Sequence, residues 1–251
     1  MRPIPRVIMD VQALNAALSG RPLLERITLL PRLVSGRLVF TTSFGLEDQA
    51  LTHALATSGI PVTIATLDTG RLFPETYDVW AETEDRYRLH IESYSPHSDA
   101  LKALVATQGI NGFRRSVEAR KACCATRKVE PLRRALVGAA GWITGLRADQ
   151  SAHRAATPLA EHDAAHDLLK INPLGDWTRP DVERYVADNA IPYNPLHDRG
   201  YPSIGCAPCT RAVRVGEPER AGRWWWEEDA KKECGLHLRD GRLQRRPEAV
   251  A

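Results

Sequence analysis

The sequence has no apolar run long enough to span a bilayer, and residues 1–10 contain prolines and charges where a signal peptide needs an apolar segment. Neither sign of charge dominates, because 34 basic residues face 31 acidic ones and leave a net charge of +3. Such a balance gives no indication of a nucleic-acid or membrane surface. Cysteine is scarce, with five residues among 251. We therefore expect a cytoplasmic protein whose cysteines serve metal binding or catalysis, since disulfides are rare in a reducing compartment.

What is present indicates a folded α/β protein, with 43% hydrophobic and 26% charged residues. Apolar residues at helical spacing predict a helical lead-in over residues 1–36. From residue 37, short β-rich runs alternate with helix-length segments, which predicts a doubly wound parallel sheet in a main domain over residues 37–238. We expect a flexible charged tail over 239–251. Strands are expected at 38–43, 61–67, 90–94, 141–144 and 168–172, and helices at 47–58, 74–87, 99–108, 127–137 and 177–189.

Three segments with hydroxyls, glycines and backbone amides follow predicted strands. The segment TTSFGLED contains Ser43 and Gly45, LDTGRLFPET begins at Leu67, and GLRADQS contains Gly145 and Arg147. Because the carboxyl ends of parallel strands meet at one edge, the segments together predict a nucleotide pocket. The Arg147 guanidinium suits an anion. Simpler interpretations are a capped strand-to-helix turn for the first segment and a surface salt bridge for Arg147.

The cysteines fall into two pairs and a single residue. Cys123 and Cys124 are adjacent, Cys206 and Cys209 have the C-x-x-C spacing, and Cys234 stands alone. A C-x-x-C pair alone could be a zinc knuckle or a redox dithiol, but two pairs indicate one four-thiolate site. Because a tandem pair makes an awkward zinc knuckle, we favour an iron–sulfur cluster over zinc.

The single cysteine, Cys234, follows two lysines and precedes His237. Nearby cations favour the reactive thiolate, although a lone cysteine is more often a free surface thiol. Upstream, Arg220 and Arg223 lie beside three consecutive tryptophans. Such a run is costly to expose without a function, but it could also pack a loop onto the core.

Taken together, the motifs resemble those of bacterial assimilatory adenosine 5′-phosphosulfate reductases, the cluster-bearing branch of the sulfonucleotide reductase family. The resemblance extends from about residue 37 to residue 237. It rests on the segments TSFGLED, LDTGRLFPETY, CCATRKVEPL, GLRADQS, IPYNPLHDRGYPSIGCAPCT, GRWWWE and ECGLH, which occur in this order.

The resemblance implies an adenine-nucleotide α-hydrolase-like fold, with the C-x-x-C in a cluster-binding loop region. It implies one [4Fe–4S] cluster on Cys123, Cys124, Cys206 and Cys209, and Cys234 as the nucleophile. It further implies that the phosphosulfate meets Lys128, Arg220, Arg223 and His237, and that the nucleotide meets Ser43, Gly45, Leu67, Gly145 and Arg147.

The activity that the resemblance implies is reduction of adenosine 5′-phosphosulfate to sulfite and AMP through a cysteine S-sulfonate, in sulfate assimilation and cysteine biosynthesis. With four of the five cysteines assigned to the cluster, the chain keeps no resolving thiol, so an external dithiol such as thioredoxin or glutaredoxin is expected as the electron donor. We expect neither a nucleic acid nor a membrane as a partner, and a homo-oligomer is compatible with the sequence.

Two other functions fit part of the pattern. A tRNA-thiolating ATP pyrophosphatase with a cluster would require an ATP-cleaving glycine-rich loop, which TSFGLED lacks, and a broad basic surface. A non-catalytic iron–sulfur or zinc regulator that binds nucleic acid would make Cys234 incidental. Product analysis with adenosine 5′-phosphosulfate and reduced thioredoxin separates all three.

Overall fold

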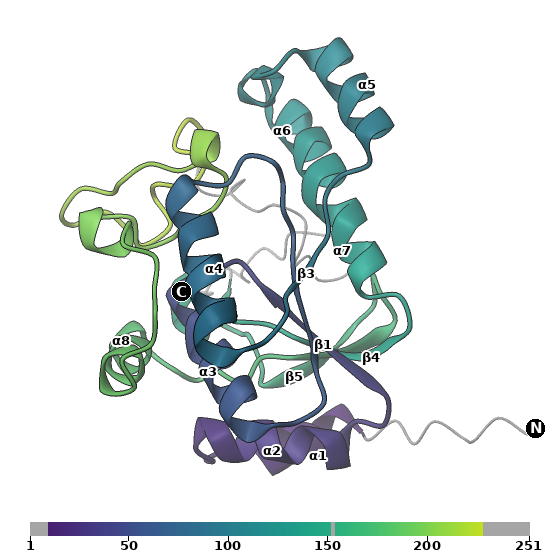
Figure 1. Cartoon of the computed structure of the whole chain (residues 1–251), viewed down its shortest axis with the longest axis vertical. Helices are drawn as coiled ribbons and strands as arrows, with labels where there is room; N and C mark the ends of the chain where they lie inside the picture. The colour runs from purple at the N-terminus through teal and green to yellow at the C-terminus, as the bar shows by residue number, and fades with distance from the viewer. Residues whose placement is uncertain (1–9, 152–153, 228–251) are drawn as a thin grey trace, which may run out of the picture.

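The computed structural model describes residues 10–151 and 154–227. The helices are α1 (Val11–Leu18), α2 (Leu23–Leu33), α3 (Leu46–Ser58), α4 (Pro74–Tyr87), α5 (Ser98–Gln108), α6 (Val117–Cys124), α7 (Glu130–Ala135) and α8 (Arg179–Asp188). The strands are β1 (Arg37–Thr42), β2 (Thr63–Thr66), β3 (Glu92–Ser93), β4 (Ala139–Ile143), β5 (Ala160–Asp163) and β6 (Leu168–Ile171). Figure 1 shows the region after α8, in green to yellow, beside α4 and α8.

The six strands form one sheet in the order β3-β2-β1-β4-β6-β5, parallel except for β5, which runs antiparallel to β6. The chain leaves β1 towards β2 on one side and later returns to β4 on the other. This reversal opens a crevice at the carboxyl ends of β1 and β4, where doubly wound sheets bind ligands. The predicted doubly wound α/β fold is confirmed.

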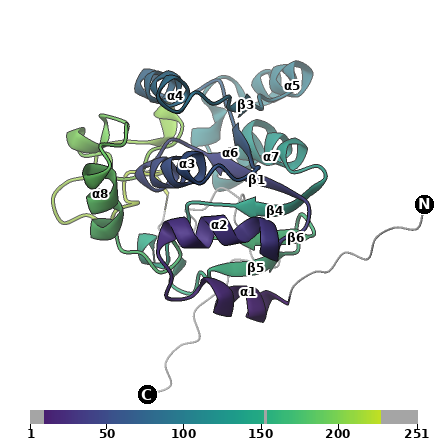
Figure 2. The same cartoon turned by 60° about the horizontal axis from the view of Figure 1, so that its bottom comes forward.

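Each face of the sheet packs on its own apolar cluster. Along β1, Leu38 and Phe40 belong to one cluster, whereas Val39 belongs to the other, as the alternation of side chains along a strand requires. The larger cluster joins the sheet to α1, α2, α3 and α8, and the smaller one joins it to α7. The helical lead-in shares this core, and Asn15 of α1 bonds both the backbone N–H and the carbonyl of Ala160 at the edge strand β5 (Figure 2).

The secondary structure differs from the sequence prediction at strand β5 and around helices α6 and α7. Strand β5 was not expected, because its sequence AEHD is short and polar; pairing with β6 and with Asn15 stabilises it. The helix expected at 127–137 is the end of a π-helical turn at Ala125–Val129 followed by α7, and helix α6 directly before this turn was not predicted. Pro131 has no N–H to donate to residue 127, which removes one α-helical hydrogen bond at this turn.

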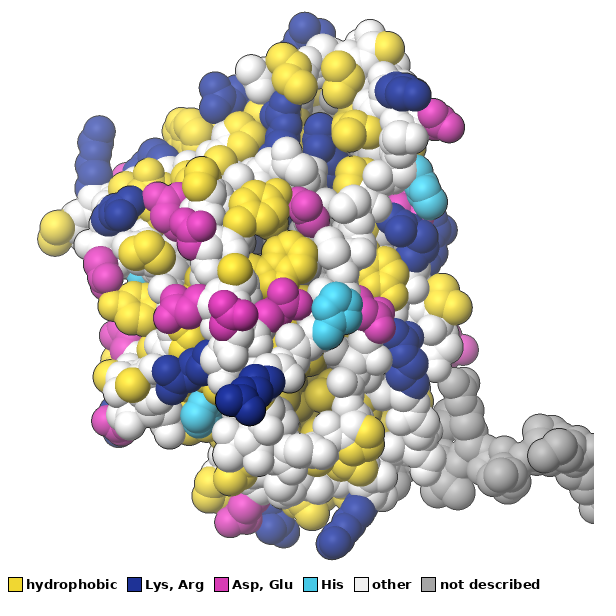
Figure 3. All heavy atoms as spheres, viewed as in Figure 1, with side chains coloured by type: hydrophobic (Ala, Val, Ile, Leu, Met, Phe, Trp, Pro, Cys, Tyr) yellow, Lys and Arg dark blue, Asp and Glu magenta, His cyan; other side chains and the backbone are white. Residues whose placement is uncertain are grey.

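One face of the molecule shows how the charged side chains are distributed. Figure 3 shows basic and hydrophobic side chains interleaved at the upper end, over α5 and α6, and acidic side chains across the middle. Within the described residues, no helix has the length and apolarity to cross a membrane. The predicted tail over 239–251 lies outside the described residues.

Candidate functional site

A cavity of about 180 Å³ opens at the carboxyl ends of β1, β2 and β4. The loop after β1 contributes Ser43 and Gly45, the end of β2 contributes Leu67, and the end of β4 contributes Gly145. These four residues from the three predicted nucleotide segments therefore line one cavity. Their arrangement follows from the parallel register of the three strands, which brings their carboxyl ends to one edge.

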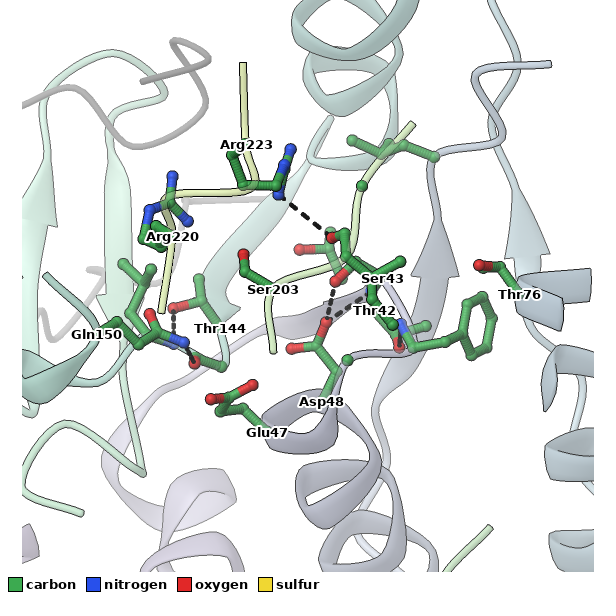
Figure 4. A pocket seen from close by; sticks show the side chains of 18 of the residues that line it. Thr42, Ser43, Glu47, Asp48, Thr76, Thr144, Gln150, Ser203, Arg220 and Arg223 are labelled. Atoms are coloured by element: carbon green, nitrogen blue, oxygen red, sulfur yellow. Dashed lines mark hydrogen bonds between the residues drawn. The ribbon is translucent and has the colours of Figure 1, made fainter. Parts of the chain in front are cut away.

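Asp48, in the first turn of α3, fixes the shape of the loop after β1. Its Oδ2 accepts hydrogen bonds from the backbone N–H of Ser43 at 2.6 Å and from the Ser43 hydroxyl at 2.7 Å (Figure 4). A Cβ atom at Gly145 would overlap the Asp48 carboxylate, so β4 can approach this closely only with glycine there. Burial raises the pKa of Asp48 to about 6.

Basic side chains line the cavity opposite α3. Figure 4 shows Arg220 and Arg223 on the far side of the cavity from Glu47 and Asp48. Lys128 reaches the cavity from the π-helical turn between α6 and α7. The cavity thus combines polar strand ends on one wall with cations on the other, which suits an anionic nucleotide.

Arg147 does not line this cavity, contrary to the expectation that it binds the substrate. Its side chain is fully buried, and its guanidinium contacts Glu47 at 2.8 Å, Glu219 at 3.1 Å and Asp149 at 3.3 Å. Burial would raise the pKa of Glu47, but Arg147 lowers it below its ordinary value. The guanidinium is therefore occupied by carboxylates of the protein itself.

A second pocket adjoins the first. All four cysteines of the two pairs line it, and the two pockets share Lys128, Arg223 and Trp224. Further cations on its wall are Arg71, Arg120 and Arg127. The structure thus brings the tandem pair and the C-x-x-C pair together, although 82 residues separate Cys124 from Cys206 in the sequence (206 − 124).

The thiols of the second pocket differ in their electrostatic environment. Burial would raise the pKa of Cys206, but Lys128 and a 3.3 Å contact with the Thr69 hydroxyl outweigh it and lower the pKa. Burial and the neighbouring Cys206 raise the pKa of Cys209 to about 11. Neighbouring thiols thus oppose one another's ionisation, while the cations on the wall favour it.

The donor set of this pocket fits an iron–sulfur cluster. It offers four cysteine sulfurs amid cations and the apolar side chains of Phe113, Pro208 and Trp224. A single zinc ion would need its four thiolates within about 4 Å of one another, since Zn–S bonds are about 2.3 Å long. In residues 10–151 and 154–227, no group of three His, Cys, Asp or Glu side chains is arranged so that it could hold a metal ion.

Trp224 lines both pockets and is itself tightly held. The guanidinium groups of Arg120 and Arg223 lie over its indole ring, with Cζ atoms 4.6 and 4.7 Å from the ring centroid. Its backbone is left-handed, with φ of 42°, which is uncommon for a bulky residue. Arg120 is also paired with Glu227 at 2.6 Å in a buried contact. These contacts fix the segment that carries Arg220 and Arg223.

Two predicted residues, Cys234 and His237, lie outside the described part of the chain. Conversely, the structure adds cavity residues that the sequence analysis missed, namely Asp48, Glu219 and Arg154. Asp48 belongs to the segment TSFGLED, but nothing in the sequence indicates that its carboxylate accepts hydrogen bonds from Ser43. Glu219 and Arg154 are charged residues in loops, and only the fold turns them towards the cavity.

Comparison with known proteins agrees with this geometry. The family model described as "Phosphoadenosine phosphosulfate reductase domain" matches residues 37–212. A protein named adenosine 5′-phosphosulfate reductase from Agrobacterium fabrum is 56% identical over 229 residues, covering 91% of this chain and 88% of the relative. One of the same name from Allochromatium vinosum is 54% identical, covering 81% of this chain and 79% of the relative.

A solved structure shares the fold. The phosphoadenylyl-sulfate reductase of Candida auris, in a phosphate complex, superposes with a TM-score of 0.69 at 28% identity, covering 81% of this chain and 96% of that one. The family match spans more than half of the present chain, and the relatives are matched over most of their length. The chain belongs to the phosphoadenosine phosphosulfate reductase family.

Proposed function

We propose that this protein reduces adenosine 5′-phosphosulfate to sulfite and AMP in the cytoplasm, as a step of sulfate assimilation and cysteine biosynthesis. The observation that carries the proposal is the cavity at the strand ends, whose basic wall also borders the four-cysteine pocket. The names of the relatives from Agrobacterium fabrum and Allochromatium vinosum support adenosine 5′-phosphosulfate as the substrate.

Charge compensation is the main contribution of the described residues to the chemistry. A phosphosulfate carries dense negative charge, and an anionic thiolate can approach its sulfur only where cations offset that charge. Lys128, Arg220 and Arg223 line the cavity from one side and supply such cations. Ser43 and Gly145 at the strand ends would hold the nucleoside, so that the phosphosulfate points towards these cations.

The nucleophile in this proposal is the Cys234 thiolate, with His237 as a further phosphosulfate contact. Its sulfur attacks the sulfate sulfur, a sulfur–sulfur bond forms, and the bond from that sulfur to the bridging oxygen breaks. AMP leaves with the bridging oxygen and its electron pair, and the enzyme keeps an S-sulfonate. Four of the five cysteines face the second pocket, so none of them is at hand to resolve this adduct.

An external dithiol, thioredoxin or glutaredoxin, completes the cycle in this proposal. One of its thiolates attacks the Cys234 sulfur, and sulfite leaves with the electron pair of the sulfur–sulfur bond. The second thiol of the donor then attacks the mixed disulfide and frees Cys234. The donor is oxidised to its disulfide, and these two electrons reduce the sulfate sulfur to sulfite.

The second pocket supports a [4Fe–4S] cluster held by Cys123, Cys124, Cys206 and Cys209. When bound, such a cluster supplies a large delocalised charge and a rigid anchor for two distant segments of the chain. Lys128 and Arg223, which line both pockets, would then respond to the cluster as well as to the substrate.

Product analysis tests the proposed function. Purified protein, adenosine 5′-phosphosulfate and reduced thioredoxin should yield sulfite and AMP in equal amounts, with one thioredoxin oxidised per turnover. ATP with a tRNA acceptor should yield no pyrophosphate. Absence of sulfite from a preparation that binds the nucleotide would contradict the proposal.

A further inference from the structure

Two glutamates lie on the wall of a cavity that we assign to an anion. Glu47, from α3, and Glu219, from the segment after the C-x-x-C motif, both line it. Left uncompensated, such carboxylates would repel a phosphosulfate. Both contact the buried guanidinium of Arg147, which lies behind the wall and reaches Glu47 at 2.8 Å and Glu219 at 3.1 Å.

The contacts around Arg147 join three parts of the fold. Its Nε donates to Glu47 of α3 at 2.9 Å, and its Nη2 donates to both carboxylate oxygens of Glu219, at 3.3 and 3.1 Å. Its Nη1 donates to Asp149, which follows β4. Arg179, at the start of α8, lies 3.7 Å from Glu219 on another side. Glu219 is therefore held by guanidinium groups from two elements.

The position of Glu219 determines that of its basic neighbours. Arg220 is the next residue and lines the cavity. Tight backbone turns follow, in which Ala221 N–H donates to the carbonyl of Pro218 at 2.9 Å and Arg223 N–H donates to the carbonyl of Arg220 at 3.0 Å. A displacement of Glu219 would therefore be transmitted to both arginines.

We propose that Arg147 and Glu219 form a positioning pair that anchors the Arg220–Arg223 segment against the strand-end wall of the nucleotide cavity. The pair acts through Arg220 and Arg223 and does not touch the substrate. The planar guanidinium of Arg147 serves three carboxylates at once, which a lysine ammonium on a single flexible stem would not. The proposal rests on the proposed function, because the segment is held in place for a phosphosulfate.

Two substitutions of Glu219 distinguish the effect of its hydrogen bonds to Arg147 from the effect of its negative charge. Glu219→Gln keeps an oxygen that accepts from Arg147, whereas Glu219→Leu has a similar size and no acceptor. Both remove the same charge, so a difference between them reports the anchor. Arg147 keeps Glu47 and Asp149 as partners in both variants, which guards against an uncompensated buried charge.

Glu217 provides a matched control in the same segment. It pairs with Arg211 at 2.8 Å and does not line the cavity. Glu217→Leu removes a glutamate two residues away without touching Arg147, and it should leave nucleotide binding within about twofold of the parent.

The test measures dissociation constants for adenosine 5′-phosphosulfate and for adenosine in a Cys234→Ser background, where turnover is blocked. Glu219→Leu should weaken phosphosulfate binding by roughly tenfold to a hundredfold, the range expected when a hydrogen bond to a charged group is lost. Adenosine binding should stay within about threefold of the parent, since the strand ends hold the nucleoside. Glu219→Gln should retain most of the affinity for adenosine 5′-phosphosulfate.

Equal phosphosulfate affinity of the Glu219→Leu variant and the parent would overturn the anchoring role. Equal losses for the leucine and glutamine variants would also overturn it, because the charge and not the anchor would then matter. A parallel loss of adenosine binding would indicate general damage to the fold and count against the pair. If the Cys234→Ser parent fails to bind adenosine 5′-phosphosulfate, the proposed function itself fails, and the anchoring role with it.

Discussion

The guanidinium of Arg223 lies against the backbone of Gly205, in the space that a Cβ atom at residue 205 would occupy. Arg223 Nη1 also donates to the carbonyl of Ile204 at 3.2 Å. Gly205 directly precedes Cys206. The loop that carries the C-x-x-C motif therefore also holds the Arg223 guanidinium at the nucleotide cavity.

Gly205→Ala should displace the Arg223 guanidinium and weaken binding of adenosine 5′-phosphosulfate. A lost hydrogen bond to a charged group costs about 1.5–3 kcal/mol, so the dissociation constant should rise roughly 10- to 150-fold. Calorimetric titration of the Cys234→Ser protein with and without the substitution measures this change, and iron analysis checks that the neighbouring cluster ligand is intact.

A double-mutant cycle assigns the effect of Gly205→Ala to Arg223. If the substitution acts through the guanidinium, adding it to Arg223→Gln should weaken binding no further. Multiplied losses in the double variant would mean that Gly205 acts by another route.

Metal content tests the four-cysteine pocket. Anaerobically purified protein should be brown and hold about four iron and about four acid-labile sulfide per chain, with little zinc. Cys206→Ser should lose iron and activity together, because it removes one of the four proposed ligands and the same loop holds Arg223 at the nucleotide cavity. One zinc per chain without sulfide would contradict the assignment.

The pH dependence of stability should carry a contribution from Asp48. Its pKa is about 6 when folded and 3.8 ordinarily, so at pH 7 its buried charge destabilises the folded state by about 3 kcal/mol. Below pH 6 the folded state takes up a proton that the unfolded state still lacks, and the destabilisation is relieved. The group thus lowers stability above pH 6 and ceases to do so as the pH falls towards 4.

Asp48→Asn should remove this contribution. Relative to the variant, the wild type should gain about 1 kcal/mol in free energy of unfolding between pH 7 and pH 5. Urea unfolding of both proteins at the two pH values measures the gain. A difference between the proteins that does not change with pH would show that Asp48 does not titrate in this range.

The nucleotide without a 3′-phosphate should be the better substrate. Arg71, the cation that could recognise a 3′-phosphate, does not line the nucleotide cavity; it lines the cysteine pocket and donates to the carbonyl of Ile110 at 2.6 Å. Each hydrogen bond that a buried 3′-phosphate lacks costs on the order of 1.5–3 kcal/mol. We expect kcat/KM to favour adenosine 5′-phosphosulfate by at least about a hundredfold. A reversed ratio would overturn the substrate assignment.

Much of the fold follows from periodicity. The alternation of β1 and the helix limits of α4 at Pro74 and Tyr87 agree with the sequence prediction, because both patterns are local. Strand β5 was missed because its partners, β6 and Asn15, and not its own residues, stabilise it. The π-helical turn was missed because helical spacing looks similar on either side of it.

The site could be predicted where a motif carries the chemistry, as for Ser43 and Gly145, which line the cavity. Arg147 could not, since a sequence shows a guanidinium but not the carboxylates that surround it. Glu219 shows the same limit, because its role depends on a contact across 72 residues of chain.

The most direct test of the account is mass spectrometry of the protein after incubation with adenosine 5′-phosphosulfate and no reductant. The account predicts one added SO₃ group on the peptide that contains Cys234, one AMP released per chain, and neither product in Cys234→Ser, which retains its cluster. An adduct on any other residue, or AMP and sulfite formation by Cys234→Ser, would contradict it.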